Sequence, residues 1–398
     1  MEFWLRRGVA GFRMDVINLI SKDQSFPDAP IIDPESKYQP GERFFTNGPR
    51  FHEFMHGIYD NVLSRYDTIT VGETAYITEM SEIIKTVGST AKELNMAFTF
   101  DHMEIEDIKT RGESKWSLRD WKLPELKSIL GGWQKRMREW DGWNALFLEC
   151  HDQARSVSRY TNDTDEYRDR AAKMLALMMT TLGGTLYLYQ GQEIGMRNFP
   201  ADWDPEVDYK DVESVNFWKK MKELHPDGSE ALQEARILLQ KKARDHARTP
   251  MQWDSTPHAS FTVPEATPWM RVNDDYRVIN VEAQTNVESQ RNGVLSVWQY
   301  WQQALRLRKQ HRDVFVYGDF EHVDHDNEKV FAYLRTDARK SEKWLVVMNW
   351  TTEEVEWTIP AGIYVRNWVS SSLQSPVSST STASIKLQAF EGVLGVCN

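Results

Sequence analysis

Five short apolar segments, separated by stretches with helical periodicity, restrict the fold of this chain more than any other feature of its sequence. Each segment is rich in β-branched or aromatic residues and is bounded by turn or polar residues, as strands are. The segments are GVAGFRMD (8–15), TITVGE (68–73), NMAFTF (95–100), NALFLE (144–149) and GTLYLYQ (184–190). Helical stripes lie between most of them, at 50–66, 125–140 and 166–182. This alternation predicts βα units with parallel strands, in part of a (β/α)8 barrel or in an open doubly wound sheet.

The pattern changes near the C-terminus. An amphipathic helix is predicted at 298–311, and alternating strands with no helix between them follow Gly318. They are KVFAYLRT (329–336), KWLVVMNW (343–350), VEWTIP (355–360) and SIKLQAF (384–390). Such strands predict a small antiparallel β-domain. A Ser/Thr-rich stretch, 370–384, is predicted to be a mobile loop within that domain.

Composition excludes several classes of function. The net charge is −11, and no long Lys/Arg run is present, so no nucleic-acid partner is expected. No apolar run approaches the roughly 20 residues that span a bilayer, so no membrane partner is expected. The first residues lack the pattern of a secretory signal. The two cysteines, Cys150 and Cys397, form neither a disulfide framework nor a zinc signature. These features together predict a cytoplasmic protein.

Charged side chains gather where the predicted strands end. Arg13 and Asp15 are two residues apart in a strand and therefore project from the same face. Glu73 ends the second predicted strand, and His151 and Asp152 follow the fourth. A structural ion pair between Arg13 and Asp15 is an equally good interpretation of that stretch alone. The position of the whole set favours an active site, because barrels carry their active sites at the carboxyl ends of the strands.

Two or three carboxylates on one face suit glycoside hydrolysis, which needs one ionised carboxylate and one protonated carboxyl group. Asp15 beside Arg13 suits the ionised role. Glu73, in the less charged setting TVGETAY, suits the protonated role, because burial without a cation favours the neutral form. Asp152 could hydrogen-bond the sugar hydroxyls. A metal site is the weaker alternative, because one histidine with scattered carboxylates lacks the usual ligand spacing, and no metal or cofactor is expected.

Five motifs resemble the α-glucosidases of the α-amylase superfamily (glycoside hydrolase family 13), most of all the oligo-1,6-glucosidase and maltase group. They are GFRMDVINLISK, TVGETAY, ECHDQARSVSRY, GGTLYLYQGQEIGM and RDHARTPMQWD, and the resemblance extends over nearly the whole chain. It implies a retaining exo-α-glucosidase that releases terminal glucose from short oligosaccharides such as isomaltose, maltose or sucrose. It further implies that Asp15 is the nucleophile, Glu73 the general acid/base and Asp152 the transition-state stabiliser.

The resemblance also implies the residues that bind substrate. Arg13 and His151 would contact the sugar, and Arg248, with Arg244 as the alternative, would hold the non-reducing glucose. Val16 resembles the residue that accompanies α-1,6 preference in the family, although a small change in pocket shape is worth only ~1–3 kcal/mol. A monomer is expected. Cys150 stands where the family motif more often has asparagine, and it is expected to be a small buried side chain.

One departure concerns the start of the barrel. The nucleophile motif ends the fourth barrel strand in the family, whereas here it ends the first. The implied fold is the C-terminal part, about five βα units, of a TIM (β/α)8 barrel over residues 1–317, from strand four onward. The antiparallel β-domain then covers 318–398. Because five strands cannot close a barrel, the chain is expected to be a fragment with weak activity alone. An inactive short product, a chain paired with another chain, and a glucosyl-transfer or sucrose-isomerising relative are the alternatives.

Overall fold

The computed structural model describes residues 1–34, 37–77, 80–108, 115–286, 294–373 and 383–398. These residues form two compact units. The first unit contains Met1–Trp121, Glu125–Leu146 and Gly183–Leu186, and the second contains Lys122–Pro124, Phe147–Leu182 and Tyr187–Asn398. Each unit buries hydrophobic clusters of its own.

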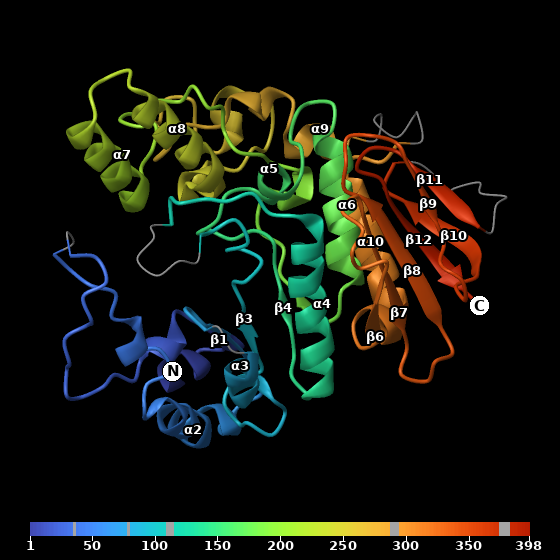
Figure 1. Cartoon of the computed structure of the whole chain (residues 1–398), viewed down its shortest axis with the longest axis horizontal. Helices are drawn as coiled ribbons and strands as arrows, with labels where there is room; N and C mark the ends of the chain where they lie inside the picture. Colours follow the sequence, from blue (N-terminus) through green and yellow to red (C-terminus); the bar gives the residue numbers. More distant parts are fainter. Residues whose placement is uncertain (35–36, 78–79, 109–114, 287–293, 374–382) are drawn as a thin grey trace. The chain divides into compact units, whose positions relative to one another are not determined.

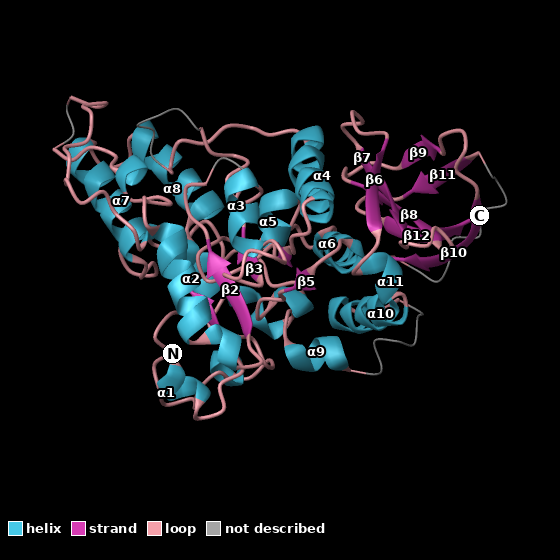
Figure 2. Ribbon diagram, turned by 90° about the horizontal axis from the view of Figure 1, so that it is seen from below, coloured by secondary structure: helices cyan, strands magenta, loops and turns pink. Residues whose placement is uncertain are grey.

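The first unit contains five short parallel strands, some labelled in Figure 1 and others in Figure 2. They are β1 (Gly11–Met14), β2 (Ile69–Glu73), β3 (Met96–Phe98), β4 (Ala145–Leu146) and β5 (Thr185–Leu186). β1, β2 and β3 form one sheet and β4 pairs with β5, while a parallel bridge between Ala97 and Asn144 connects the two groups. All five predicted strands are confirmed, although the paired parts of β4 and β5 are shorter than predicted.

The strand order decides between the two predicted architectures. The strands are neighbours in chain order, whereas a doubly wound sheet reverses its order at one point. Within the described residues, β1 pairs only with β2 and β5 only with β4, so both edges of the sheet are open. The first unit therefore contains part of a (β/α)8 barrel.

Helices cover one side of these strands. They are α1 (Glu2–Leu5), α2 (Phe51–Asn61), α3 (Met80–Val87) and α4 (Leu123–Glu139), whose first two residues belong to the second unit. Phe51 and Met55 of α2 and Trp133 of α4 are buried in one cluster with Ala97 of β3. The helix predicted at 50–66 ends at Asn61, and a 3₁₀ turn at Leu63–Arg65 follows it.

The second unit has a helical part and an antiparallel β-domain. Its helices are α5 (Ser156–Tyr160), α6 (Arg168–Thr181), α7 (Val212–Leu224), α8 (Glu230–Lys242), α9 (Val281–Thr285), α10 (Val297–Gln310) and α11 (Arg312–Phe315). α6 is buried almost all round and packs against α10. Ser296 and Gln299 form a capping box that starts α10, close to the predicted start. Among the described residues, no helix is long and apolar enough to cross a membrane.

The predicted antiparallel β-domain is present at the C-terminus (Figure 2). Its strands are β6 (Asp319–Val323), β7 (Val330–Thr336), β8 (Lys343–Asn349), β9 (Val355–Thr358), β10 (Val365–Ser371), β11 (Ser384–Leu387) and β12 (Gly392–Cys397). One sheet has the order β10-β12-β8-β7-β6, and β9 pairs with β11 in a second. β6, β10 and β12 were not predicted. Residues 374–382 of the predicted mobile loop lie outside the described residues.

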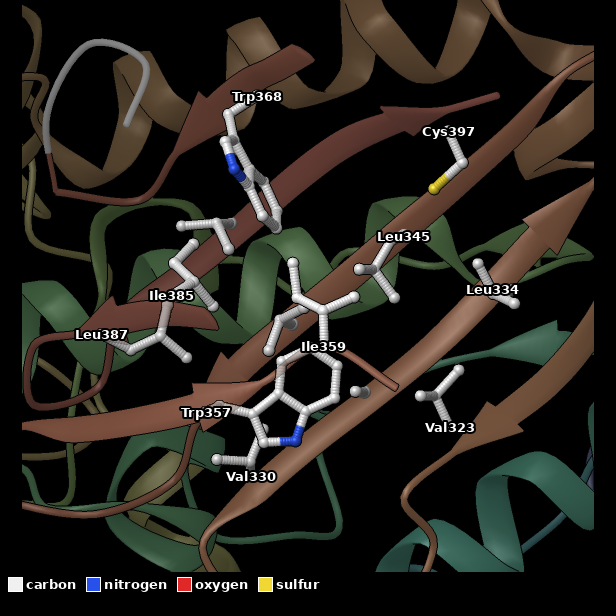
Figure 3. Packing of buried hydrophobic residues seen from close by; sticks show 13 residues of the cluster. Val323, Val330, Leu334, Leu345, Trp357, Ile359, Trp368, Ile385, Leu387 and Cys397 are labelled. Atoms are coloured by element: carbon white, nitrogen blue, oxygen red, sulfur yellow. The ribbon is translucent and has the colours of Figure 1, made fainter. Parts of the chain in front are cut away.

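The core of the β-domain lies between these two sheets (Figure 3). Trp357 of β9 is only 3% exposed there and packs with Val330, Leu345 and Ile385. Its indole Nε1 donates a hydrogen bond to Asp324 Oδ2 at 2.8 Å. Trp357 therefore contributes both apolar area and a satisfied polar contact to the packing of the two sheets.

Trp357→Ala is expected to destabilise the β-domain by ~3–5 kcal/mol, because it leaves a large cavity and removes one hydrogen-bond donor from Asp324. Hydrogen–deuterium exchange of the β7 and β8 amides measures this loss. Trp269→Ala is the control, because that tryptophan is 56% exposed. Equal exchange rates in the two variants would contradict the central place of Trp357 in this core.

Candidate active site

The carboxyl ends of β1 and β2 bring three predicted residues together in the first unit. Arg13 pairs in register with Val71, which places Asp15 opposite Glu73 at the end of the ladder. The Arg13 guanidinium donates to both carboxylates, from Nη1 to Asp15 Oδ1 and from Nη2 to Glu73 Oε2, the latter at 2.5 Å. We call Arg13, Asp15 and Glu73 the carboxylate group. One cation holds both carboxylates near each other.

The shared arginine corrects one premise of the sequence interpretation. Glu73 was expected to lie in a setting without a cation, whereas Arg13 contacts it directly. The reason is the parallel register, because residues 13 and 15 of one strand and residues 71 and 73 of the next project from the same face. The stretch TVGETAY alone gives no sign of this contact, because Arg13 lies 60 residues before Glu73.

The two carboxylates differ in their environments. The side chain of Asp15 is 72% exposed, and that of Glu73 is 13% exposed. Burial raises the pKa of Glu73, the Val16 amide and Arg13 oppose this rise, and the neighbouring Asp15 adds to it. The pKa of Glu73 therefore lies above its ordinary value, in the direction expected for a proton donor. Burial and the like charge of Asp15 raise this pKa, although the adjacent Arg13 lowers it.

The turn after β1 holds this arrangement in place. Val16 adopts a left-handed conformation with φ 33°, which is strained for a β-branched residue, and its N–H donates to Glu73 Oε2 at 3.3 Å. Asn18 is fully buried, and its side-chain amide bonds the backbone of Ala75 through both its nitrogen (2.7 Å) and its oxygen (3.0 Å). The loops that follow β1 and β2 are thereby fastened to each other.

The other predicted residues gather in the second unit, after the fourth strand. His151 Nε2 lies 3.0 Å from Asp152 Oδ2. Arg244 Nη1 and Arg248 Nη2 both contact Asp152 Oδ1, at 3.1 Å and 2.7 Å. Arg248 Nε also donates to the backbone oxygen of His151 at 2.7 Å. We call these four residues the arginine group. The preferred arginine, Arg248, and its alternative, Arg244, thus bind the same carboxylate.

Sequence reasoning missed two acidic residues that contact the arginine group, Asp211 and Glu213. Asp211 Oδ2 accepts from Arg248 Nη1 at 2.6 Å, and Glu213 Oε2 lies 3.1 Å from Arg244 Nε. Asp211 also caps α7 by accepting from the Glu213 N–H at 3.0 Å. An aspartate directly before a helix is a capping signal that the sequence contains. The capping signal does not predict that Asp211 also contacts arginines more than thirty residues away.

Cys150 differs from the expectation of a buried side chain. Within the described residues it forms no disulfide, and the residue is half-buried. The N–H of Asp152 donates to Cys150 Sγ at 3.4 Å. Cys150 lies beyond the paired part of β4, directly before His151 and Asp152. Within the described ranges, no group of three or more His, Cys, Asp or Glu side chains is arranged to hold a metal ion.

Comparison with protein families gives two matches. Residues 1–318 match the family described as "Alpha amylase, catalytic domain", and residues 320–394 match "Maltogenic Amylase, C-terminal domain". The chain is 42% identical to the oligo-1,6-glucosidase of Parageobacillus thermoglucosidasius over 364 residues, which are 90% of this chain and 60% of that protein. It is 40% identical to an α-glucosidase of Schizosaccharomyces pombe over 363 residues, with coverages of 91% and 60%. The chain thus spans about 60% of the length of these relatives.

Solved structures agree with these matches. The chain aligns over its whole length with the trehalose-6-phosphate hydrolase of Bacillus licheniformis, with a TM-score of 0.85, 37% identity and 67% of that chain covered. It also aligns over its whole length with the isomaltulose synthase of Erwinia rhapontici NX5, with a TM-score of 0.86, 31% identity and 66% of that chain covered.

Proposed function

Because the chain belongs to the α-amylase family of glycoside hydrolases, we propose that it supplies the catalytic carboxylates of a retaining exo-α-glucosidase. The observation that carries this proposal is the carboxylate group. An exposed carboxylate and a partly buried carboxyl group of raised pKa share one arginine at the ends of neighbouring strands. A retaining mechanism needs two such groups about 5 Å apart, one to attack and one to donate a proton.

In the proposed reaction, Asp15 attacks the anomeric carbon of the terminal glucose while Glu73 gives its proton to the leaving glycosidic oxygen. A covalent glucosyl–Asp15 intermediate results, and the rest of the oligosaccharide leaves as an alcohol. Glu73, now ionised, removes a proton from water, which attacks the same carbon and releases glucose and free Asp15. Two inversions give α-glucose as the first product.

The arginine group supports a second part of the proposal. Asp152 would hydrogen-bond the ring hydroxyls as the sugar flattens, and its contacts with Arg244 and Arg248 would hold it for this role. His151 and Arg248, together with Arg13, would contact the bound glucose. The substrates would be short oligosaccharides, without a cofactor, acted on by a cytoplasmic monomer. We further propose that residues 1–317 belong to the catalytic barrel and 318–398 to the β-domain.

Proton NMR tests the proposed function. The test uses a fusion protein, which we call the extended chain. It joins this chain to the part of the P. thermoglucosidasius oligo-1,6-glucosidase that has no counterpart in this chain. The signal of α-glucose is expected before that of β-glucose during hydrolysis of isomaltose. The appearance of β-glucose first would mean inversion, and it would remove the nucleophilic role from Asp15.

Val16→Thr is expected to shift the extended chain from α-1,6 toward α-1,4 linkages, because Val16 directly follows Asp15 and its N–H contacts Glu73. The ratio of kcat/KM for isomaltose and maltose is expected to fall about 10-fold, as a small change in pocket shape allows. Val278→Thr, at a valine that is 73% exposed, is the matched control. An unchanged ratio in Val16→Thr would end the case for Val16 as a linkage determinant.

Glucosyl transfer is the second candidate function, and the similarity to isomaltulose synthase favours it. The same carboxylates would form the same intermediate, but the acceptor would be a sugar hydroxyl and not water. Incubation of the extended chain with sucrose distinguishes the two functions. Free glucose as the main product supports hydrolysis, whereas a disaccharide other than sucrose supports transfer.

A further inference from the structure

Asp211 stands behind the arginine group as a common partner of both arginines. Its Oδ2 accepts from Arg248 Nη1 at 2.6 Å, and its Oδ1 lies 3.2 Å from both Nε and Nη2 of Arg244. The Asp211 side chain is only 3% exposed. Glu213 also contacts Arg244, but its side chain is 40% exposed. Asp211 is therefore the buried counter-charge of the pair.

The same two arginines converge on a single oxygen of Asp152. Arg244 and Arg248 each hold Asp152 Oδ1 with one nitrogen and Asp211 with another. Each guanidinium thus forms a bridge between two carboxylates. A long side chain loses rotamer freedom when it is held in one geometry, and two charged contacts at opposite ends of the guanidinium oppose that loss. Removal of the Asp211 charge would weaken these contacts, and the Nε of Arg244 and of Arg248 would keep only Glu213 and the His151 oxygen, respectively.

The backbone fixes Asp211 itself. Asp211 caps α7, and its own N–H donates to Asp245 Oδ1 at 2.8 Å. Asp245 is 1% exposed and also accepts from Ser214 Oγ at 2.7 Å. The residue whose carboxylate contacts the arginines is therefore also anchored at the start of α7 through its side chain and its backbone N–H.

We propose that Asp211 is a positioning residue, which acts through Arg244 and Arg248 to fix the orientation of Asp152. This inference rests on the proposed function, because it takes Asp152 as a group that stabilises the transition state. A purely structural role of Asp211 as the helix cap would require a different property of its side chain. The cap needs only an oxygen acceptor, which asparagine also supplies, whereas the arginines need the negative charge.

NMR of the arginine side chains in the 398-residue chain tests the positioning directly. A guanidinium held at both ends rotates slowly about its Nε–Cζ bond and gives separate Nη signals. Asp211→Asn keeps the cap, and it is expected to merge these signals for Arg244 and Arg248. Asp337→Asn is the matched control, because each aspartate is 6% exposed as a whole residue and Asp337 accepts from its own hairpin. Separate signals in Asp211→Asn would overturn the proposal.

Kinetics of the extended chain give the second test. Asp211→Asn is expected to lower kcat/KM for isomaltose on the order of 10- to 100-fold relative to Asp337→Asn, with most of the loss in kcat, because a misplaced catalytic group costs rate. Equal kcat in the two variants would overturn the proposal. A failure of the proposed function has a different result, in which Asp152→Asn retains the activity of the unsubstituted extended chain. The NMR signals still report on Asp211 in that case.

Discussion

Asp15→Asn in the extended chain is expected to lower kcat/KM for isomaltose by at least ~10⁴-fold, the range seen when a catalytic nucleophile is removed. The amide cannot attack the anomeric carbon, so no glucosyl intermediate forms. The fold is expected to survive, because the Asp15 side chain is 72% exposed and Arg13 keeps its contact with Glu73. Circular dichroism measures the fold, and glucose release measures the turnover.

Asp60→Asn is the control for this substitution. Asp60 is an exposed aspartate of α2 and lies outside the carboxylate group. Its replacement is expected to leave kcat/KM unchanged. Removal of a nucleophile leaves far less than a tenth of the activity. If Asp15→Asn retained more than about a tenth of the turnover, Asp15 would have to be reassigned as a structural partner of Arg13.

Glu73→Gln is expected to reduce hydrolysis of isomaltose by ~10³- to 10⁴-fold, near the upper range for general acid catalysis. The loss should depend on the leaving group. A sugar alcohol needs the proton of Glu73, whereas p-nitrophenolate leaves without one. Formation of the glucosyl intermediate from p-nitrophenyl α-glucoside, followed as a burst of p-nitrophenol, is therefore expected to fall much less than hydrolysis of isomaltose. Equal losses for both substrates would exclude Glu73 as the acid.

The pH profile provides a second reading of Glu73. Its pKa is raised by burial and by Asp15, so the protonated form that donates the proton persists to higher pH than for an ordinary glutamate. The alkaline limb of kcat/KM should therefore lie above the ordinary pKa of glutamate, and it should be absent in Glu73→Gln. Glu93→Gln is the matched control, because burial also raises the pKa of Glu93 in the same unit. If the alkaline limb disappeared in Glu93→Gln, the limb would report on Glu93 and not on Glu73.

Local sequence patterns were enough to predict the parallel strands and the side chains at their ends. The segment GFRMD places Arg13 and Asp15 on one face through the period of a strand alone, and the structure pairs these two residues. The helices α6 and α10 follow from the apolar stripes of their sequences. These features depend on neighbours within a few residues, which the sequence contains.

Contacts between distant residues could not be predicted in this way. The bond of Arg13 to Glu73 depends on the register of two strands, and that of Arg248 to Asp211 depends on how a 3₁₀ helix meets the start of α7. β6 was missed because DFEHV has too few apolar residues to alternate clearly. Motif resemblance supplied the roles of the site residues, but no part of it indicated Asp211.

Trapping of the glucosyl intermediate tests the central claim most directly. 5-Fluoro-α-glucosyl fluoride has a good leaving group, and its ring fluorine slows the second step, so the intermediate accumulates on a retaining enzyme. After incubation of the extended chain and proteolysis, mass spectrometry should find one fluoroglucosyl group on the peptide that contains Asp15. The label should be absent from Asp15→Asn. A label on a different carboxylate, or turnover of the reagent without any labelled peptide, would contradict the assignment of Asp15 as the nucleophile.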